Sequence, residues 1–319
     1  MKTFHLIMIK PSHYDDMGYV IQWWRSGMPS NTLATLQGLA DDCVRRQVLG
    51  KKVEIKLTAI DETNYRVRID KLSRMIMKDG GKGLIALVGV QSNQYPRALD
   101  LARGFREKRI QVCIGGFHVG GCLAMLPELT TELQEALDLG VSLFAGEAEE
   151  GRLDQVLQDA WQQNLQPIYN YMDDLPGMEN APTPFTSIDR VKHTVGSQAS
   201  FDAGRGCPFL CSFCTIINVQ GRKSRYRNAD DVERIIRDHL QQGIKRFFIT
   251  DDNFARNRNW KAIYQRLIEL RERESLNFNL ALQVDTMCHK IKGFIEMSAQ
   301  AGVKRVFIGL ENINPESLM

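Results

Sequence analysis

The sequence predicts an α/β protein made of two successive series of strand–helix units. Three observations predict this fold class. Apolar, β-branched runs alternate with helix-period segments in the first half, a proline-rich stretch interrupts the alternation, and the alternation then returns. Such βαβ rhythms favour parallel sheets covered by helices. A chain of 319 residues also suits two domains. We expect one domain over 1–165, a linker over 166–196 and a second domain over 197–319.

The first series contains five expected strands and the helical segments between them. The strands are expected at Phe4–Ile9, Val53–Leu57, Leu84–Val90, Ile110–Ile114 and Val141–Ala145. The helices are expected at Thr32–Arg46, Arg66–Lys78, Arg97–Lys108, Leu123–Leu139 and Glu149–Gln163. Strand order cannot be read from these segments. A doubly wound, Rossmann-like sheet with right-handed crossovers is the default expectation.

The linker and the second series follow. Four prolines between 166 and 196 argue against regular elements there: Pro167, Pro176, Pro182 and Pro184. The next strands are expected at Ala199–Ala203, Arg246–Thr250, Asn279–Val284 and Val306–Leu310. Helices are expected at Asp230–Gln242, Arg258–Glu274 and Ile291–Ala301. These repeated βα units fit part of a barrel or a second doubly wound sheet.

Composition and charge argue against two classes of partner. The net charge is +3, from 41 basic and 38 acidic residues, so no global charge draws the chain to nucleic acid or to a membrane surface. No apolar run approaches the roughly 20 residues of a membrane helix. The amino terminus also lacks the cleavage site of a signal peptide. We expect a cytoplasmic protein with no membrane span and no nucleic-acid partner.

The cysteines indicate metal chemistry rather than disulfides. There are seven, an odd number, and Cys207, Cys211 and Cys214 follow one another in a C-x3-C-x2-C pattern. Such spacing lets one loop wrap three thiolates around one metal centre. Three thiolates leave one iron of a four-iron cluster open, which is typical of a catalytic site. The alternatives are three buried thiols or a structural zinc site with a fourth ligand such as His193 or His239.

The triplet resembles the radical S-adenosylmethionine (SAM) superfamily. It follows the first strand of a βα series and has an aromatic residue, Phe213, before its last cysteine. The resemblance implies a [4Fe-4S] cluster on the three cysteines and SAM on the open iron. Reductive cleavage of SAM would give methionine and a 5′-deoxyadenosyl radical. Residues at three strand ends would also contact SAM, although the usual Gly-Gly-Glu is absent: Asp251, Asp252, Asn253, Gln283, Asp285 and Glu311.

A run of cations follows the triplet, from Gly221 to Arg227. One interpretation is a solvated loop, or cations that pair with Asp230 and Asp231. The other is neutralisation of an anionic cluster–SAM complex or substrate. We favour the first interpretation.

The first domain completes a resemblance to the cobalamin-binding branch of the radical SAM enzymes. It lacks the glycine motifs of dinucleotide and P-loop sites, but glycine-rich loops follow its strands. The resemblance implies that these loops bind cobalamin through Gln91, Ser92, Asn93, Gly115, Gly116, His118, Gly146 and Glu147. The family motif D-x-H-x-x-G is incomplete, because Gly116 stands in place of its aspartate. We therefore favour hydrogen bonding over cobalt ligation for His118.

The family resemblance implies a cobalamin-dependent radical SAM enzyme, most often a methyltransferase that acts on a carbon of a small-molecule substrate. Its electrons would come from an external donor of the flavodoxin or ferredoxin type. Two alternatives remain open. One is an oxidative cyclase with the same cofactors and no methyl transfer, and the other is a zinc-binding interaction protein.

The count of strands suggests an incomplete barrel. Radical SAM barrels usually have six βα units, whereas only four strands are expected after the linker. The last of them, Val306–Leu310, would be an apolar edge without a partner. We therefore expect this chain to be part of a longer protein that has the remaining barrel strands.

Overall fold

The structure is a computed structural model that describes residues 2–211, 213–310 and Asn314. It divides into two compact units, each considered by itself below. Unit 1 consists of Met1–Ser26 and Thr32–Pro176, and unit 2 of Gly27–Asn31 and Gly177–Met319. Among the helices of the described residues, none is both long and apolar enough to cross a membrane.

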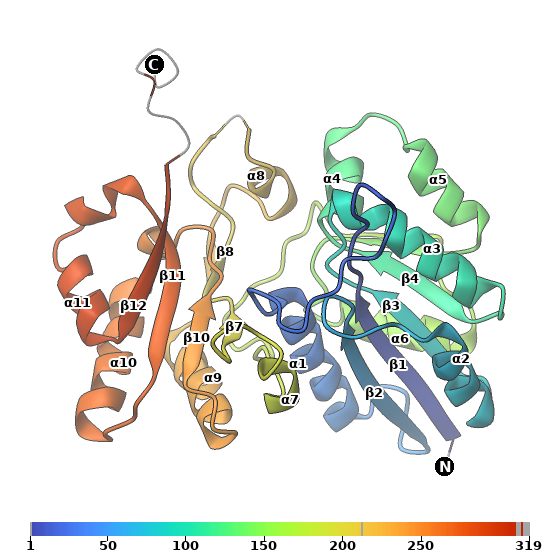
Figure 1. Cartoon of the computed structure of the whole chain (residues 1–319), viewed down its shortest axis with the longest axis horizontal. Coiled ribbons are helices and arrows are strands. Elements are labelled where there is room, and N and C mark those ends of the chain that lie inside the picture. The colour runs from blue at the N-terminus through green and yellow to red at the C-terminus, as the bar shows by residue number, and fades with distance from the viewer. Residues whose placement is uncertain (1, 212, 311–313, 315–319) are drawn as a thin grey trace. The chain divides into compact units, whose positions relative to one another are not determined.

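Unit 1 is a six-stranded, all-parallel sheet in the order β2-β1-β3-β4-β5-β6 (Figure 1). Its strands are β1 (Lys2–Lys10), β2 (Val53–Asp61), β3 (Gly83–Leu87), β4 (Gln111–Gly115), β5 (Ser142–Ala145) and β6 (Ile168–Asn170). Its helices are α1 (Asn31–Arg46), α2 (Ile69–Lys78), α3 (Tyr95–Arg106), α4 (Phe117–Met125), α5 (Thr131–Asp138) and α6 (Arg152–Gln162). All five predicted strands of the first series are present.

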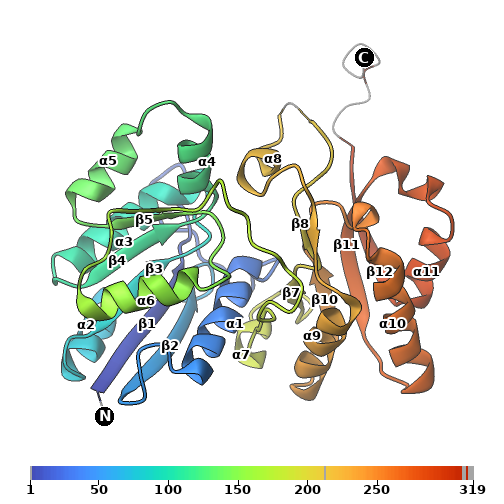
Figure 2. The ribbon, with the colours of Figure 1, turned by 180° about the vertical axis from the view of Figure 1, so that it is seen from behind.

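Helices cover both faces of this sheet, because alternate strand residues are apolar on both sides. One core joins even-numbered residues of β1, such as Phe4 and Leu6, to α1 and α6. The other joins Ile7 and Ile9 to α2, α3 and α5 (Figure 2). The predicted doubly wound, Rossmann-like sheet is therefore confirmed. The strand order reverses between β1 and β3, and ligands of such sheets bind beyond the carboxyl ends of the strands at that point.

Two local expectations for unit 1 were wrong. The single helix predicted over 123–139 is divided into α4 and α5, because Pro127 cannot continue a helix and the Thr130 hydroxyl accepts a hydrogen bond from the Leu133 amide at the start of α5. The proline-rich segment contains a strand, β6, because the run from Ile168 to Asn170 lies before Pro176 and pairs with β5. The segment predicted as a linker over 166–196 therefore contributes a strand to unit 1.

Unit 2 has a four-stranded parallel sheet in the order β12-β11-β10-β7. Its strands are β7 (Ala199–Phe201), β10 (Arg246–Ile249), β11 (Asn279–Asp285) and β12 (Val303–Gly309), with a small antiparallel pair, β8 (Gly204–Arg205) and β9 (Arg225–Tyr226). Its helices are α7 (Ile188–Val191), α8 (Ile216–Val219), α9 (Ala229–Gln241), α10 (Trp260–Arg273) and α11 (Phe294–Gln300). The short α7 lies within the predicted linker.

Helices α9, α10 and α11 share one core with the sheet of unit 2. Phe247 of β10 and Leu280 of β11 point into that core, whereas Phe248 and Gln283 occupy the alternate positions. A sheet with its crossover helices on one face is the arrangement of a (βα) barrel segment. The predicted α/β class is confirmed for both units. The number of strands in the complete barrel stays a prediction.

A buried ion pair joins Asp202, which directly follows β7, to Arg227, in the segment after the cysteine loop. Arg227, whose side chain is 0% exposed, donates from Nη2 to Asp202 Oδ1 at 3.1 Å and from Nε to the Asp202 carbonyl at 2.9 Å. Arg205 Nε donates to Asp202 Oδ2 at 2.6 Å. Burial alone would raise the pKa of Asp202, but the charges of Arg205 and Arg227 outweigh it and hold this pKa at about 2. The expectation that the whole cation run is solvated or pairs with Asp230 and Asp231 is therefore wrong for Arg227.

We expect Asp202→Asn to destabilise the protein by about 3–5 kcal/mol, because the change leaves the buried Arg227 guanidinium without its counter-charge. Urea unfolding monitored by tryptophan fluorescence measures the effect. Asp189→Asn is the matched control, because Asp189 pairs with Lys192 on the surface and its side chain is 84% exposed. A loss no larger than that of the control would show that the buried pair does not stabilise unit 2.

Candidate functional site

Three cysteines lie on one loop of unit 2, between β8 and α8. All three are free thiols; Cys211 is exposed, and Cys207 and Cys214 are half-buried. The Cys214 amide donates to the Cys211 carbonyl at 3.1 Å, which closes a tight turn between the last two cysteines. The three candidate thiolate ligands are therefore supplied by one loop alone.

The loop begins at a glycine that its path requires. Gly206 has a φ of +80°, and a Cβ there would lie 2.9 Å from the Gly221 carbonyl oxygen and 3.0 Å from that of Gln220. Both the backbone angle and the close approach exclude larger residues. Gly206 thus lets the chain enter the cysteine loop directly against the segment that leaves it.

The thiols lie close enough to one another to interact electrostatically. Burial is the largest cause that raises the pKa of Cys207, and the negative charges of Asp252, Cys211 and Cys214 raise it further. Three cysteines on one loop are thiolate ligands in the number that leaves one iron of a four-iron cluster open, and a metal ion deprotonates the thiols that bind it. Their donor set therefore fits a [4Fe-4S] cluster.

Asp251, at the end of β10, turns its carboxylate toward its own chain. Oδ1 accepts the Ala203 and Gly204 amides at 2.7 and 2.8 Å, and Oδ2 accepts Asn257 Nδ2 at 3.1 Å. Burial raises the pKa of Asp251 to about 7, against the effect of these hydrogen bonds. The geometry gives Asp251 the role of positioning the turn that precedes the cysteine loop. Its predicted contact with SAM stays a prediction.

Asp252 lies differently from its neighbour. Burial raises its pKa to about 6, and the opposing hydrogen bond comes from its own backbone amide. Its charge raises the pKa of Cys207, so this carboxylate interacts electrostatically with the first cysteine of the loop. A desolvated carboxylate next to a metal-binding loop is the type of group that receives a cationic ligand.

The other predicted polar residues form hydrogen bonds between the carboxyl ends of β10 and β11. Asn253 Nδ2 donates to Asp285 Oδ2 at 2.8 Å, and Gln283 Nε2 donates to the Asp251 carbonyl at 3.4 Å. Burial alone would raise the pKa of Asp285, but hydrogen bonds from Arg256 and Asn253 leave it below its usual range. The structure thus brings together four of the strand-end residues that the sequence indicated. Glu311 lies outside the described residues.

Arg256 is the residue that the sequence interpretation missed. It donates to both oxygens of Asp285, at 2.7 and 2.9 Å, and its guanidinium carbon lies 5.3 Å from the centre of the Phe209 ring. It therefore connects the cysteine loop to β11. The sequence did indicate Arg256 indirectly, because it lies three residues after Asn253 in the same loop at the end of β10. Phe213, the predicted aromatic neighbour of SAM, is 67% exposed.

In unit 1 the predicted cobalamin residues also lie at carboxyl ends of strands. Gln91, Ser92 and Asn93 are exposed beyond β3, in or beside a short 3₁₀ helix (Ser92–Gln94). Gly115 and Gly116 follow β4, and Gly146 and Glu147 follow β5. The loops after β3 and β4 lie at the centre of the sheet edge where the strands have their carboxyl ends, because β3 and β4 are the two central strands.

The glycines of these loops are required by the protein's own backbone. Gly116 has a φ of +144°, and a Cβ there would lie 2.2 Å from the Val90 nitrogen. A Cβ on Gly146, with a φ of +104°, would lie 3.0 Å from the Tyr171 backbone. Close packing within unit 1 thus explains both glycines without a ligand. We conclude that Gly116→Val would disturb the fold of unit 1.

Both ring nitrogens of His118 face groups of unit 1. Nδ1 lies 3.2 Å from Ser92 Oγ, and Nε2 lies 2.9 Å from Glu132 Oε1 and 3.8 Å from Cys122 Sγ. The ring also lies against Tyr95, with 4.3 Å between centroids. These contacts support a hydrogen-bonding role for His118 over ligation of cobalt.

Similar proteins in other organisms act as methyltransferases. The chain is 24% identical over 222 residues to the hopanoid C-2 methylase of Rhodopseudomonas palustris, across 69% of this chain and 40% of that protein. It is 25% identical over 250 residues to the bacteriochlorophyllide d C-8(2)-methyltransferase of Chlorobaculum tepidum, across 73% of this chain and 51% of that protein. The chain thus spans about half or less of the length of these relatives.

The fold is similar to that of a solved structure. The solved structure is that of the radical SAM methyltransferase TsrM from Kitasatospora setae with cobalamin and a [4Fe-4S] cluster bound. Its TM-score to this chain is 0.67, and the two sequences are 14% identical. The likeness covers 100% of this chain and 62% of that one. At this level of identity it concerns the fold alone, and it includes both units.

The family model that matches this chain is that of the radical SAM superfamily, over residues 202–319. This region begins at Asp202 and contains the cysteine loop together with the strand ends of β10 and β11. The match favours the iron–sulfur cluster over the structural zinc site. The chain therefore contains a domain of the radical SAM superfamily.

Proposed function

We propose that the chain is the cofactor-binding part of a cobalamin-dependent radical SAM enzyme that methylates a carbon of a small molecule. The observation that carries the proposal is the cysteine loop within the radical SAM domain, with Asp252 beside it. Methyl transfer is supported by the two methyltransferase relatives. Cobalamin is supported by the likeness to a fold solved with it and by the exposed loop at the switch point of unit 1.

The chain's own residues would divide the work as follows. Cys207, Cys211 and Cys214 would hold the cluster, and the Asp252 carboxylate would accept a hydrogen bond from the amino group of SAM. Asp251 and Arg256 would hold the cysteine loop and the ends of β10 and β11 in position. When bound, the cluster and SAM supply a carbon radical, and cobalamin supplies a methyl carrier.

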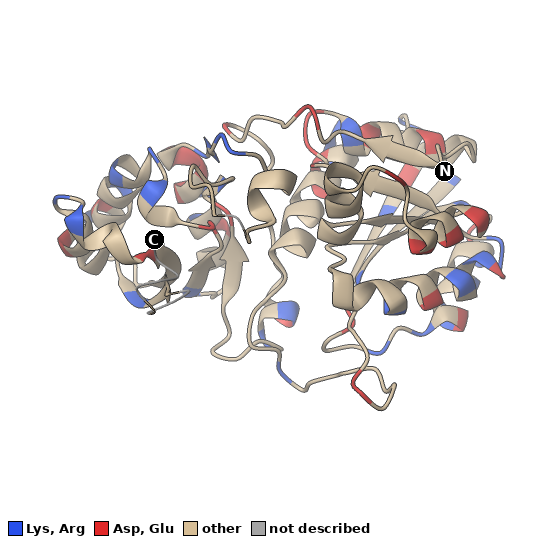
Figure 3. Cartoon of the chain, turned by 90° about the horizontal axis from the view of Figure 1, so that it is seen from above, with Lys and Arg blue, Asp and Glu red and all other residues tan. Residues whose placement is uncertain are grey.

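The partners are part of the proposal. Electrons would come from an external flavodoxin or ferredoxin. Basic and acidic residues are interspersed along the elements of each unit (Figure 3), so no single charged element indicates where such a donor binds. An oxidative cyclase would use the same cofactors, and a transferred methyl group in the product distinguishes methylation from cyclisation.

We expect replacement of Cys207, Cys211 and Cys214 by Ala to abolish iron binding, because each thiolate holds a different iron. Iron and sulfide analysis after anaerobic reconstitution measures this loss. Cys288→Ala is the matched control, since Cys288 is a buried thiol of the same unit. A triple variant that kept its iron and still formed 5′-deoxyadenosine would contradict the assignment.

We expect Asp252→Asn to weaken SAM binding about tenfold or more, because a hydrogen bond to a charged group contributes about 1.5–3 kcal/mol. Calorimetric titration of the reconstituted protein with SAM measures the change, and the iron content should stay unchanged. Asp238→Asn, at an exposed position of α9, controls for the loss of one negative charge. Equal SAM affinities in the two variants would remove Asp252 from the proposed site.

We expect Asn93→Trp to weaken cobalamin binding about tenfold or more, because a large ring at this exposed position would occupy the space beyond β3. Absorbance titration of the full chain with hydroxocobalamin measures the change. Lys51→Trp provides the control, because Lys51 is exposed in the turn before β2, at the opposite edge of the sheet. If Lys51→Trp impaired binding as much as Asn93→Trp does, the proposed location would be wrong.

A further inference from the structure

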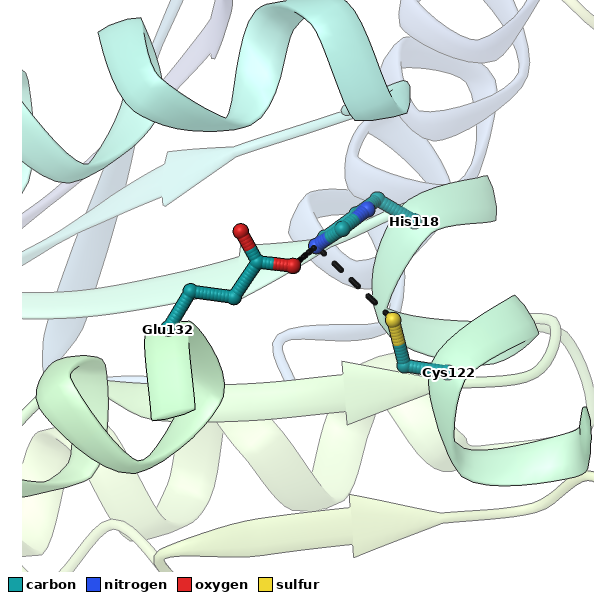
Figure 4. Close-up of side chains that lie close together, drawn as sticks. All are labelled: His118, Cys122 and Glu132. Carbon is teal, nitrogen blue, oxygen red and sulfur yellow. Dashed lines mark hydrogen bonds and ion pairs between the residues drawn. The ribbon is translucent and has the colours of Figure 1, made fainter. Parts of the chain in front are cut away.

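A second group of possible metal ligands lies in unit 1, apart from the cysteine loop. His118 and Cys122 come from α4, and Glu132 comes from the first turn of α5. Figure 4 shows the three side chains pointing toward one another. One ligand atom of each lies within 4.8 Å of the other two. We propose that His118 Nε2, Cys122 Sγ and a carboxylate oxygen of Glu132 bind a zinc ion.

The spacing of these atoms suits a tetrahedral ion. Zinc binds nitrogen at about 2.0 Å and sulfur at about 2.3 Å, so two such ligands lie about 3.5 Å apart. The distance from His118 Nε2 to Cys122 Sγ is 3.8 Å. His118 Nε2 and Glu132 Oε1 are 2.9 Å apart and would separate by a few tenths of an ångström. The Glu132 side chain is 46% exposed and has the freedom to move by that amount.

The sequence places two of the ligands on one helix face. His118 and Cys122 are four residues apart, and residues at i and i+4 lie above one another on a helix. The two histidines of helical zinc motifs use the same spacing. Pro127 ends α4 and forces the chain to turn, so that Glu132 of α5 faces the pair. The broken helix that sequence patterns did not predict is thus what assembles the site.

Neighbouring groups hold the histidine in the orientation that a metal ligand needs. Ser92 Oγ lies 3.2 Å from Nδ1, which leaves Nε2 directed at Cys122 and Glu132. The Tyr95 ring packs on the imidazole with 4.3 Å between centroids, and its hydroxyl donates to the Glu132 carbonyl at 3.1 Å. Outer partners of this kind orient metal-binding histidines and fix their tautomer.

The ligand chemistry selects zinc over harder cations. Thiolate and imidazole ligands suit zinc, whereas Mg²⁺ and Ca²⁺ take oxygen ligands. A thiolate and a carboxylate also neutralise the two charges of Zn²⁺, so the occupied site carries no net charge next to the 8% exposed His118. Three protein ligands leave one position for water on the exposed side of Glu132. This composition is typical of zinc sites with an open position.

The test separates this site from the cysteine loop. The full chain, with its cluster reconstituted anaerobically, is equilibrated with zinc chloride in a metal buffer and then desalted. Metal analysis should find one zinc per chain in addition to the cluster iron. X-ray absorption at the zinc edge should show a single sulfur neighbour at about 2.3 Å.

Variants then identify the ligands. Cys122→Ser should remove the sulfur neighbour, and both Cys122→Ser and Glu132→Gln should lower zinc affinity by more than the ten- to hundredfold typical of losing an outer partner. Ser92→Ala should lower it within that range. Cys113→Ala is the control, because Cys113 is a buried thiol on β4 of the same unit and should leave zinc and iron unchanged.

Other results would overturn the proposal. Absence of tightly bound zinc in the reconstituted chain would do so. Three sulfur neighbours together with a loss of iron would place the zinc in the cysteine loop instead. Zinc affinity unchanged by Cys122→Ser, in a variant whose circular dichroism matches that of the unmodified chain, would show an adventitious ion only. The outcome is independent of whether the chain binds cobalamin, because that is measured separately.

Discussion

The carboxylate of Asp251 is the contact that ties the chain before the cysteine loop to the sheet of unit 2. It accepts the amides of Ala203 and Gly204, so the chain that leaves β7 is tied to the end of β10. Three residues after Gly204 comes Cys207, the first cysteine of the loop. Burial disfavours the ionised form and raises the pKa of Asp251 to about 7. The loop position is therefore held by hydrogen bonds to a buried carboxyl group whose ionised form burial disfavours.

The acidic residues around this contact are distinguished by their partners. Asp202 is neutralised by Arg205 and Arg227, and Asp285 by Arg256. Burial raises the pKa of Asp252, and the charge of Asp252 raises the pKa of Cys207. Acids that are already paired stabilise the fold, whereas a desolvated carboxylate gains most from a cationic ligand. This difference separates the supports of the site from the group proposed to bind SAM.

In unit 1, as in unit 2, the polar residues lie in loops at the carboxyl ends of parallel strands. Parallel strands end at one edge of the sheet, so the loops after β3, β4 and β5 lie at that edge together. The glycines of these loops serve the close packing of the backbone, as the 2.2 Å approach at Gly116 shows. The polar side chains around His118 are held by one another. The loops at this edge are therefore positioned by contacts within unit 1, and both ring nitrogens of His118 have partners there.

The sequence by itself determined the α/β class, the main strands and the cysteine triplet, because periodicity and short motif spacing are local properties of the chain. It also indicated the strand ends that carry Asp251, Asp252, Asn253 and Asp285. Only the tertiary structure decided which acids are paired, since Arg205 and Arg227, the partners of Asp202, and Arg256, the partner of Asp285, are brought to them by packing. The pairing of β6 and the meeting of His118, Cys122 and Glu132 likewise depend on contacts between separate segments, whereas Pro127 and Thr130 mark the division of α4 from α5 in the sequence itself. Local patterns do not contain those contacts, because they form only when the chain packs.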